Sequence, residues 1–291
     1  MSNLLDSYTK ILGLLHELEP NDYFLNQIRV PKLTDKQLIA LNLAAESLGI
    51  DSERYLFKRL PLSLQAKIER TVYNRRKRNL SFKIEQLRQQ IADKINPFQV
   101  QHVIDSMPLE ICKLSRSKRA KVCRDTPEIS PDYGYCAAQK TYYFGYKFHA
   151  VCTAEGVFKA FDITRASVHD IHYLHDVKAQ FDNCILIGDK GYLSQAFQDD
   201  LFESRAIRLE TPGRRNQTAF KPFHAGYRKT RKRIETLYSQ LCDQFMIRRN
   251  YAKSFQGFAT RILSKITALT MIQWINKRNG NNINNLKIVV A

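Results

Sequence analysis

The stretch Cys184-Ile-Leu-Ile-Gly-Asp-Lys-Gly-Tyr192 decides the fold class of this chain. Its apolar run, stopped by a glycine, predicts a short strand of the buried type. The strand leads directly into Asp189, and a buried strand rarely carries a carboxylate unless that group is paired or holds a metal ion. We therefore expect a layered α/β domain with its chemistry at the end of this strand.

Strand signals precede this stretch. Residues 100–104 predict a short apolar strand that ends at Asp105. Residues 142–153 are rich in aromatic and β-branched types, and a turn containing Gly156 leads from them into 157–163, which predicts a hairpin.

Helices and strands alternate after the hairpin. Ser167 is expected to cap a helix along which apolar residues recur up to Phe181. The remaining predicted elements are a helix from Ser194, a strand at 207–209, a long helix at about 228–250 and a last helix at about 255–277. We therefore predict one catalytic domain over residues 96–280, followed by a loose Asn-rich tail at 281–291.

Residues 1–95 are predicted to be helical. Thr34 and Gln37 have capping-box spacing, and Gly49 ends the helix that follows. Ser52 can cap a second short helix that ends near Pro61, so residues 35–60 have the outline of a helix-turn-helix unit, although any small helical bundle has it too. Two more helices are expected, from about 64 into Arg75-Arg-Lys-Arg78 and over about 82–95.

The charge of the chain points to a polyanionic partner. Lys and Arg total 46 against 28 Asp and Glu, which gives a net charge of +18. Nucleic acid is the first candidate partner, and an anionic membrane surface is the second. The most apolar late stretch, 259–275, is interrupted by Arg261 and Lys265, so we expect no membrane span. Six scattered cysteines and no signal peptide predict a cytoplasmic protein.

Three carboxylates stand out as candidate metal ligands. Asp105 and Asp189 each follow an apolar strand, and Glu235 adjoins the apolar stripe of the long predicted helix. Mg²⁺ prefers oxygen ligands, and two such ions can activate a nucleophile and stabilise the leaving oxygen at a phosphodiester. The pattern alone also allows a plainer reading, in which the aspartates form turns and the glutamate makes a surface ion pair.

Basic residues flank these carboxylates and are candidate DNA contacts. They are Lys113, Arg116, Lys118, Arg119, Lys121, Arg228, Arg231 and Lys232. The run Arg75-Arg-Lys-Arg78 allows either phosphate contact or a role as an ordinary helix end.

Three short blocks then resemble the signatures of bacterial insertion-sequence transposases of the DDE type. They are Asp105-Ser-Met-Pro-Leu109, Gly188-Asp-Lys-Gly-Tyr192 and Arg231-Lys-Arg-Ile-Glu-Thr236, in that order. The sequence is most similar to insertion-sequence family 982, with a more distant similarity to the insertion-sequence 4 and 5 groups. The resemblance covers residues 100–250.

This resemblance implies an RNase H-like catalytic domain and a helical N-terminal DNA-binding domain. It assigns two Mg²⁺ or Mn²⁺ ions to Asp105, Asp189 and Glu235, and a DNA contact to Arg231. His169 and Asp170 match a pair in related transposases that would support the metal site from behind. It implies a nucleoid-associated bacterial enzyme that cuts and joins double-stranded DNA at terminal inverted repeats and a target, as a homodimer on DNA.

Other readings stay open at the level of sequence. One alternative is a metal-dependent, structure-selective nuclease on the same fold. Another is a catalytically silent DNA-binding protein, which would use only the positive charge of the chain. His169, His172 and His175 also allow a zinc site, although a helix near the active site explains them as well. Residues 188–191 lack the spacing of a phosphate-binding loop, so no use of ATP is expected.

Overall fold

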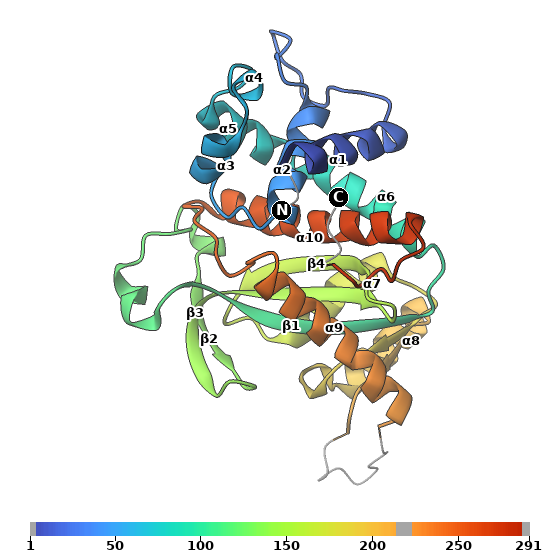
Figure 1. The fold of residues 1–291 in the computed structure, drawn as a ribbon. Coiled ribbons are helices and arrows are strands. Elements are labelled where there is room, and N and C mark those ends of the chain that lie inside the picture. Colours follow the sequence, from blue (N-terminus) through green and yellow to red (C-terminus); the bar gives the residue numbers. More distant parts are fainter. Residues whose placement is uncertain (1–3, 214–222, 287–291) are drawn as a thin grey trace. The chain divides into compact units, whose positions relative to one another are not determined.

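The computed structural model describes residues 4–213 and 223–286, and it divides into two compact units (Figure 1). One unit comprises Met1–Ile95 and Gln240–Ala291, and the other comprises Asn96–Ser239. The division into functional domains that the sequence suggests stays a prediction.

The first unit is helical. Its elements are α1 (Leu4–Leu18), α2 (Asp35–Ser47), α3 (Glu53–Arg59), α4 (Leu62–Gln65), α5 (Arg70–Asn79), α6 (Ser81–Ile95) and α10 (Phe255–Arg278). The predicted capping box is confirmed, because the Thr34 hydroxyl accepts from the Gln37 amide and the Gln37 side chain accepts from the Thr34 amide. Ser52 caps α3 as expected.

The third predicted helix is wrong in its extent. We expected one helix from residue 64 into the basic run, but the chain turns between α4 and α5 and buries Ile68 in that turn. Two cations of the basic run are structural. Arg76 pairs with Asp35 at 2.6 Å, and Lys77 pairs with Glu53 at 2.8 Å.

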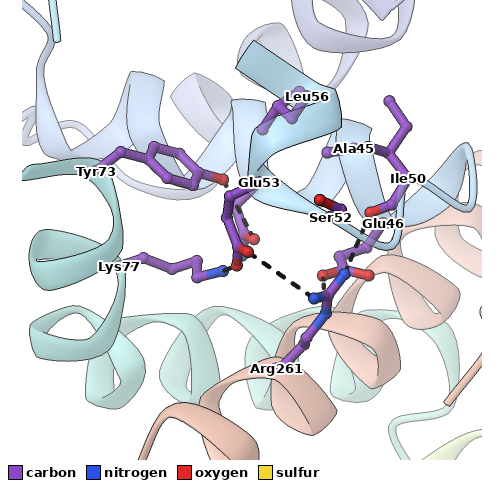
Figure 2. A pocket seen from close by; sticks show the side chains of 10 residues that line it. Ala45, Glu46, Ile50, Ser52, Glu53, Leu56, Tyr73, Lys77 and Arg261 are labelled. Carbon is purple, nitrogen blue, oxygen red and sulfur yellow. Dashed lines mark hydrogen bonds and ion pairs between the residues drawn. The ribbon is translucent and has the colours of Figure 1, made fainter. Parts of the chain in front are cut away.

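Buried ion pairs join α10 to helices that are far away in the sequence. Lys265 contacts Glu46 at 2.6 Å, and Arg261 reaches Glu46 and Glu53 at 3.5 and 4.0 Å. Figure 2 shows Arg261 between these two carboxylates, with Lys77 on the far side of Glu53. Burial acts to raise the pKa of Glu53, but Lys77 and Arg261 outweigh it and lower this pKa to about 2. The two buried cations of α10, Arg261 and Lys265, are therefore matched by acids.

The chain from Gln240 onward groups with the N-terminal helices, whereas we expected the catalytic domain to run to residue 280. In Figure 1, α10 lies alongside α6, and the Lys277 ammonium donates to the carbonyl of Lys94 at 3.1 Å. The tail expected to be loose is held as far as residue 286. The carbonyls of Asn284 and Leu286 accept from Gln240 and Gln244, and residues 287–291 lie outside the described part.

The second unit is built on a six-stranded mixed sheet. Its strands are β1 (Gln101–Cys112), β2 (Asp132–Cys136), β3 (Thr141–Thr153), β4 (Phe158–Arg165), β5 (Ile185–Ile187) and β6 (Arg208–Glu210). The path runs β2-β3-β1-β5-β6, and β4 pairs with β3 as the predicted hairpin. β1 pairs antiparallel with β3 and parallel with β5, and β5 pairs parallel with β6.

The helices and short 3-10 turns of this unit follow its strands. They are α7 (Tyr173–Gln180), α8 (Gln195–Arg205), η1 (Leu114–Arg119), η2 (Pro127–Ile129), η3 (Asp170–His172) and η4 (Lys190–Tyr192). Ile104, Leu186 and Leu209 from three strands pack with Leu174 of α7 and Leu201 of α8 in one apolar core. β2 and the 3-10 turns were not predicted.

α9 (Ala225–Asp243) crosses from the second unit into the first, and it ends earlier than the predicted residue 250. The six cysteines, all within the described residues, are free thiols. Among the described residues, no helix combines the length and the apolar character needed to cross a membrane.

Candidate active site

Strand register brings Asp105 and Asp189 to the same edge of the parallel part of the sheet. The last parallel pair of β1 and β5 joins Val103 to Ile187, and each aspartate follows its paired residue by two positions. Strand β1 does not end at Asp105 as predicted. It continues to Cys112, and Asp105 pairs with Ala150 of β3. The carboxylate therefore lies where β1 loses one neighbouring strand and keeps the other.

Asp189 is fixed by the turn that follows it. Its Oδ1 accepts from the Gly191 amide at 2.8 Å and so caps η4. A Cβ at position 191 would lie 2.9 Å from that oxygen and 3.5 Å from Oδ2 of Asp170. Gly191 therefore leaves room for two carboxylates side by side, and the plainer reading of Asp189 as a turn former holds for one of its oxygens.

Glu235 belongs to α9, whose neighbouring residues Ile234 and Leu237 are buried. The Tyr238 hydroxyl, one turn further along, donates to the carbonyl of Asp105 at 2.7 Å and fastens the helix to β1. The Glu235 side chain itself is 49% exposed, and its Oε1 pairs with Arg231 Nη2 at 2.9 Å.

The pKa of Asp105 responds to burial and to the charged groups near it. The pKa of Asp105 is raised to about 7, first by burial and then by repulsion from Asp189 and Glu235. The Ser106 amide and the Arg231 guanidinium act in the opposite direction. Asp189 of the β5–η4 turn, and Glu235 and Arg231 of α9, therefore lie near enough to Asp105 of β1 to act on its charge.

Carboxylate oxygens are the ligands that Mg²⁺ prefers, and a cation would offset the burial and the repulsion that raise the pKa of Asp105. Within residues 4–213 and 223–286, no three Asp, Glu, His or Cys side chains are grouped so that they could hold a metal ion. The Glu235 carboxylate is held in its ion pair with Arg231. The donor types fit a divalent cation.

His169 and Asp170 belong to the turn that leads into α7. His169, rather than the predicted Ser167, caps the turn that leads into α7, because its Nδ1 accepts from the Ile171 amide at 3.2 Å. Ser167 instead donates to Asp132. Asp170 pairs with Lys147 at 2.8 Å. The three histidines of the zinc alternative are all exposed, and His175 contacts the ring of Phe197.

Two tyrosines near the site were not predicted. Tyr192 follows Asp189 by three residues, and Tyr238 follows Glu235 by three. Burial and nearby acids, Asp105 among them in both cases, raise the pKa of both phenols well above the ordinary value, so both stay protonated. The buried Tyr192 hydroxyl has no hydrogen-bond partner among the described residues. Their shared spacing, three residues after a predicted metal ligand, was the signal in the sequence that could have identified them.

The predicted DNA-contact residues are distributed over two segments of this unit. Lys113, Arg116, Lys118, Arg119 and Lys121 are exposed in and around η1, and Arg228 and Lys232 are exposed on α9. Arg231 is partly buried in its ion pair with Glu235.

The parallel edge of the mixed sheet carries two aspartates, and ligands of α/β sheets bind where the strands end. The family model for the transposase DDE domain matches residues 97–271, which is more than half of the chain. The chain therefore belongs to the DDE transposase family, and its function is DNA transposition in a mobile element. No curated protein matches the sequence.

Membership explains several features together. The mixed α/β architecture fits the expected RNase H-like fold. DDE transposases bind DNA and generally use divalent metal ions, which agrees with the positive charge and with the carboxylates. The matched range includes residues of both units, so the extent of the catalytic domain stays a prediction.

Proposed function

We propose that this protein is the transposase of an insertion sequence most similar to family 982, and that it cuts and joins DNA at the terminal inverted repeats of that element. Asp105, Asp189 and Glu235 would hold two Mg²⁺ or Mn²⁺ ions. The observation that carries the proposal is the strand register that places Asp105 and Asp189 at the same edge of the parallel part of the sheet, with Glu235 near enough to act on the charge of Asp105. The natural setting would be the nucleoid of a bacterial cell.

The chain itself prepares the reacting groups. Bound ions would supply a nucleophile and stabilise the leaving oxygen. Asp105 and Asp189 are held by backbone amides through one oxygen each, Asp105 by Ser106 and Asp189 by Gly191. In each carboxylate the other oxygen is left for a ligand. Tyr238 keeps α9, and with it Glu235, against β1.

Arg231 is the part of the site that must rearrange. It now neutralises Glu235, and the resemblance assigns it to DNA near the cut. When a phosphate approaches, the guanidinium can exchange the carboxylate for the phosphate, because both anions match its planar fork. Glu235 is then free for a cation, so DNA binding and completion of the metal site are linked.

His169 and Asp170 act behind the ligands. Asp170 lies beside the Gly191 turn and is tied to Lys147, so it supports the shape of the turn that carries Asp189. We expect the cations around η1 and on α9 to contact phosphates.

Recognition of the terminal repeats is assigned to the helical unit. α2 is a mostly buried helix, whereas α3 exposes Arg54, Tyr55, Lys58 and Arg59. The Arg59 guanidinium lies over the Tyr55 ring at 5.3 Å. A buried first helix and an exposed, basic second helix are what a helix-turn-helix unit needs for the major groove. Two ends must be paired, so we expect a homodimer on DNA.

A cleavage-and-joining assay tests this proposal. The substrate is a duplex that carries the inverted repeats flanking the coding sequence, and the reaction is run with Mg²⁺ or with a chelator. We expect strand cleavage and joining of the 3′-hydroxyl end to a target duplex, both abolished by the chelator and by Glu235→Gln. Replacement of the exposed Asp182 by Asn is the control and leaves both steps intact. Cutting without joining would favour the structure-selective nuclease, and binding without either would favour a silent DNA-binding protein.

A further inference from the structure

The segment between β1 and β3, residues 113–140, forms a surface that the carboxylate site does not use. It contains η1, η2 and β2. β1 pairs with β3 only as far as Cys112 opposite Phe144, and β4 begins its pairing at Tyr146. In the described chain, Thr141–Tyr143 therefore pair with β2 alone. β2 and the start of β3 form the two-stranded ribbon seen in Figure 1.

One face of this ribbon is aromatic. Tyr135 lies opposite Tyr142, and Tyr133 lies opposite Phe144, with ring centroids 5.0 and 5.1 Å apart. Phe144 is buried, but exposure rises along the ribbon from 46% at Tyr133 to 52% at Tyr135 and 67% at Tyr142. Exposed rings that already pack against each other have little freedom left to lose when a flat ligand binds.

The basic segment is fastened to this aromatic face. The Ser117 hydroxyl of η1 lies 2.9 Å from the Tyr133 hydroxyl. Arg124 donates to the Ser117 carbonyl at 3.2 Å, and its guanidinium lies over the Phe144 ring at 5.7 Å. Arg116, Lys118 and Arg119 of η1 are exposed, and Ser117 of the same turn contacts Tyr133, so positive charge and aromatic rings belong to one connected surface.

We propose that Tyr135 and Tyr142 form a stacking platform for unpaired DNA bases, with the cations around η1 holding the adjoining phosphates. This inference rests on the proposed function, because cleavage of a DNA end supplies the unpaired strand. Aromatic rings flanked by Lys and Arg are the general solution for binding single strands, since every base has a π face and every nucleotide has a phosphate. The cations could also bind an acidic protein partner, but such a partner would not explain the exposed pair of rings.

The test compares two DNA duplexes that differ only in a short unpaired 3′ extension carrying 2-aminopurine. The double variant Tyr135→Thr/Tyr142→Thr keeps strand-forming residues and removes both rings. We expect it to bind the extended duplex about 10-fold or more weakly, to bind the blunt duplex as the wild type does, and to lose the quenching of 2-aminopurine fluorescence. The double Phe variant restores binding and quenching, because stacking needs the ring and not the hydroxyl.

Tyr251→Thr is the matched control, since Tyr251 is 65% exposed and lies outside the ribbon. Unchanged affinity and quenching in the Thr double variant, with a circular dichroism spectrum like that of the wild type, would overturn the platform. Equal weakening on both duplexes would overturn it too, because it would indicate a contact with paired DNA. If the double variant unfolds, the single variant Tyr142→Thr decides by the same readouts. A wild-type protein that binds no DNA at all would instead refute the proposed function.

Discussion

Asp105 lies on a strand whose backbone is held in place, and two other acids act on its charge. The backbone of β1 is held by β3 and by the Tyr238 hydroxyl, which fixes the position from which the Asp105 carboxylate projects. Burial and these neighbours raise its pKa to about 7. Like charges held close together lower the stability of the folded protein. Such an arrangement is typical of functional sites, where activity is selected over stability.

The first prediction at this scale concerns Asp105→Asn in the absence of divalent metal. A raised pKa means that the folded state binds the proton more tightly than the unfolded chain, whose ordinary value is 3.8. Stability through this group is therefore lost as the pH rises from about 4 to about 7. We expect the Asn variant to be more stable than the wild type at pH 8 by about 1 to 3 kcal/mol, with the gain vanishing near pH 4. Urea unfolding at both pH values measures this, and an equal effect at both would contradict it.

The second prediction concerns Tyr238→Phe. This change removes only the hydroxyl that donates to the Asp105 carbonyl, so the unfolding free energy should fall by about 1 kcal/mol. We expect strand cleavage to slow by about 10-fold or more, because Glu235 is positioned through this contact. Tyr251→Phe is the control for the loss of a phenolic hydroxyl. A Tyr238→Phe enzyme with the wild-type cleavage rate would show that the contact has no positioning role.

At the scale of helices and strands, the sequence predicted what local signals determine. The capping box of α2, the Ser52 cap of α3 and the apolar run of β5 each decide their own element, and each was confirmed. β1 was predicted to end at Asp105 because a carboxylate interrupts its apolar run. Met107 and Leu109 are buried beyond it, and Pro108 is tolerated because β1 has only β3 as a partner there.

The parts of the site that were missed depend on packing rather than on pattern. Tyr238 has no local signature beyond its spacing, and Tyr192 was noted only as the last residue of a signature block. The importance of both follows from which carboxylates lie near them. β2 was missed because its strand character depends on pairing with β3 and on Gly134. A Cβ at that glycine would come within 2.7 Å of the Ala166 carbonyl.

The prediction at this scale concerns the ion pairs of α10. Glu46 is the acid shared by Lys265 and Arg261, and all three side chains are buried. Replacing Glu46 by Ala leaves two buried cations without this partner, so we expect a loss of about 3 to 5 kcal/mol in the unfolding free energy. Glu17 forms an exposed ion pair with Arg278 in the same unit, and Glu17→Ala should cost at most about 1 kcal/mol. Equal losses in the two variants would refute the structural role of the buried network.

At the scale of the whole chain, the basic runs differ in how far their side chains are exposed. The cations around η1 and those that begin α9 are mostly exposed, whereas Arg76 and Lys77 of the N-terminal basic run are used in buried ion pairs. A run of Lys and Arg in the sequence therefore indicates a DNA contact only when its side chains remain exposed after folding.

The salt dependence of DNA affinity tests this distribution of charge. The logarithm of the association constant should fall linearly with the logarithm of the salt concentration. The double variant Lys118→Ala/Lys121→Ala should reduce the slope by about two, because each phosphate contact contributes about one. A slope unchanged from that of the wild type would place these lysines away from the DNA backbone.

The variant Asp189→Asn tests most directly whether Asp105, Asp189 and Glu235 together cut DNA. The measurement is the rate of strand cleavage with Mg²⁺ on a duplex carrying the terminal repeats, with affinity for that duplex measured in parallel. We predict a fall in the cleavage rate of about 100-fold or more, because loss of a metal ligand removes several kcal/mol of transition-state stabilisation. Affinity for the duplex should be unchanged, because we assign recognition of the repeats to other residues. Cleavage at the wild-type rate by Asp189→Asn would contradict the claim.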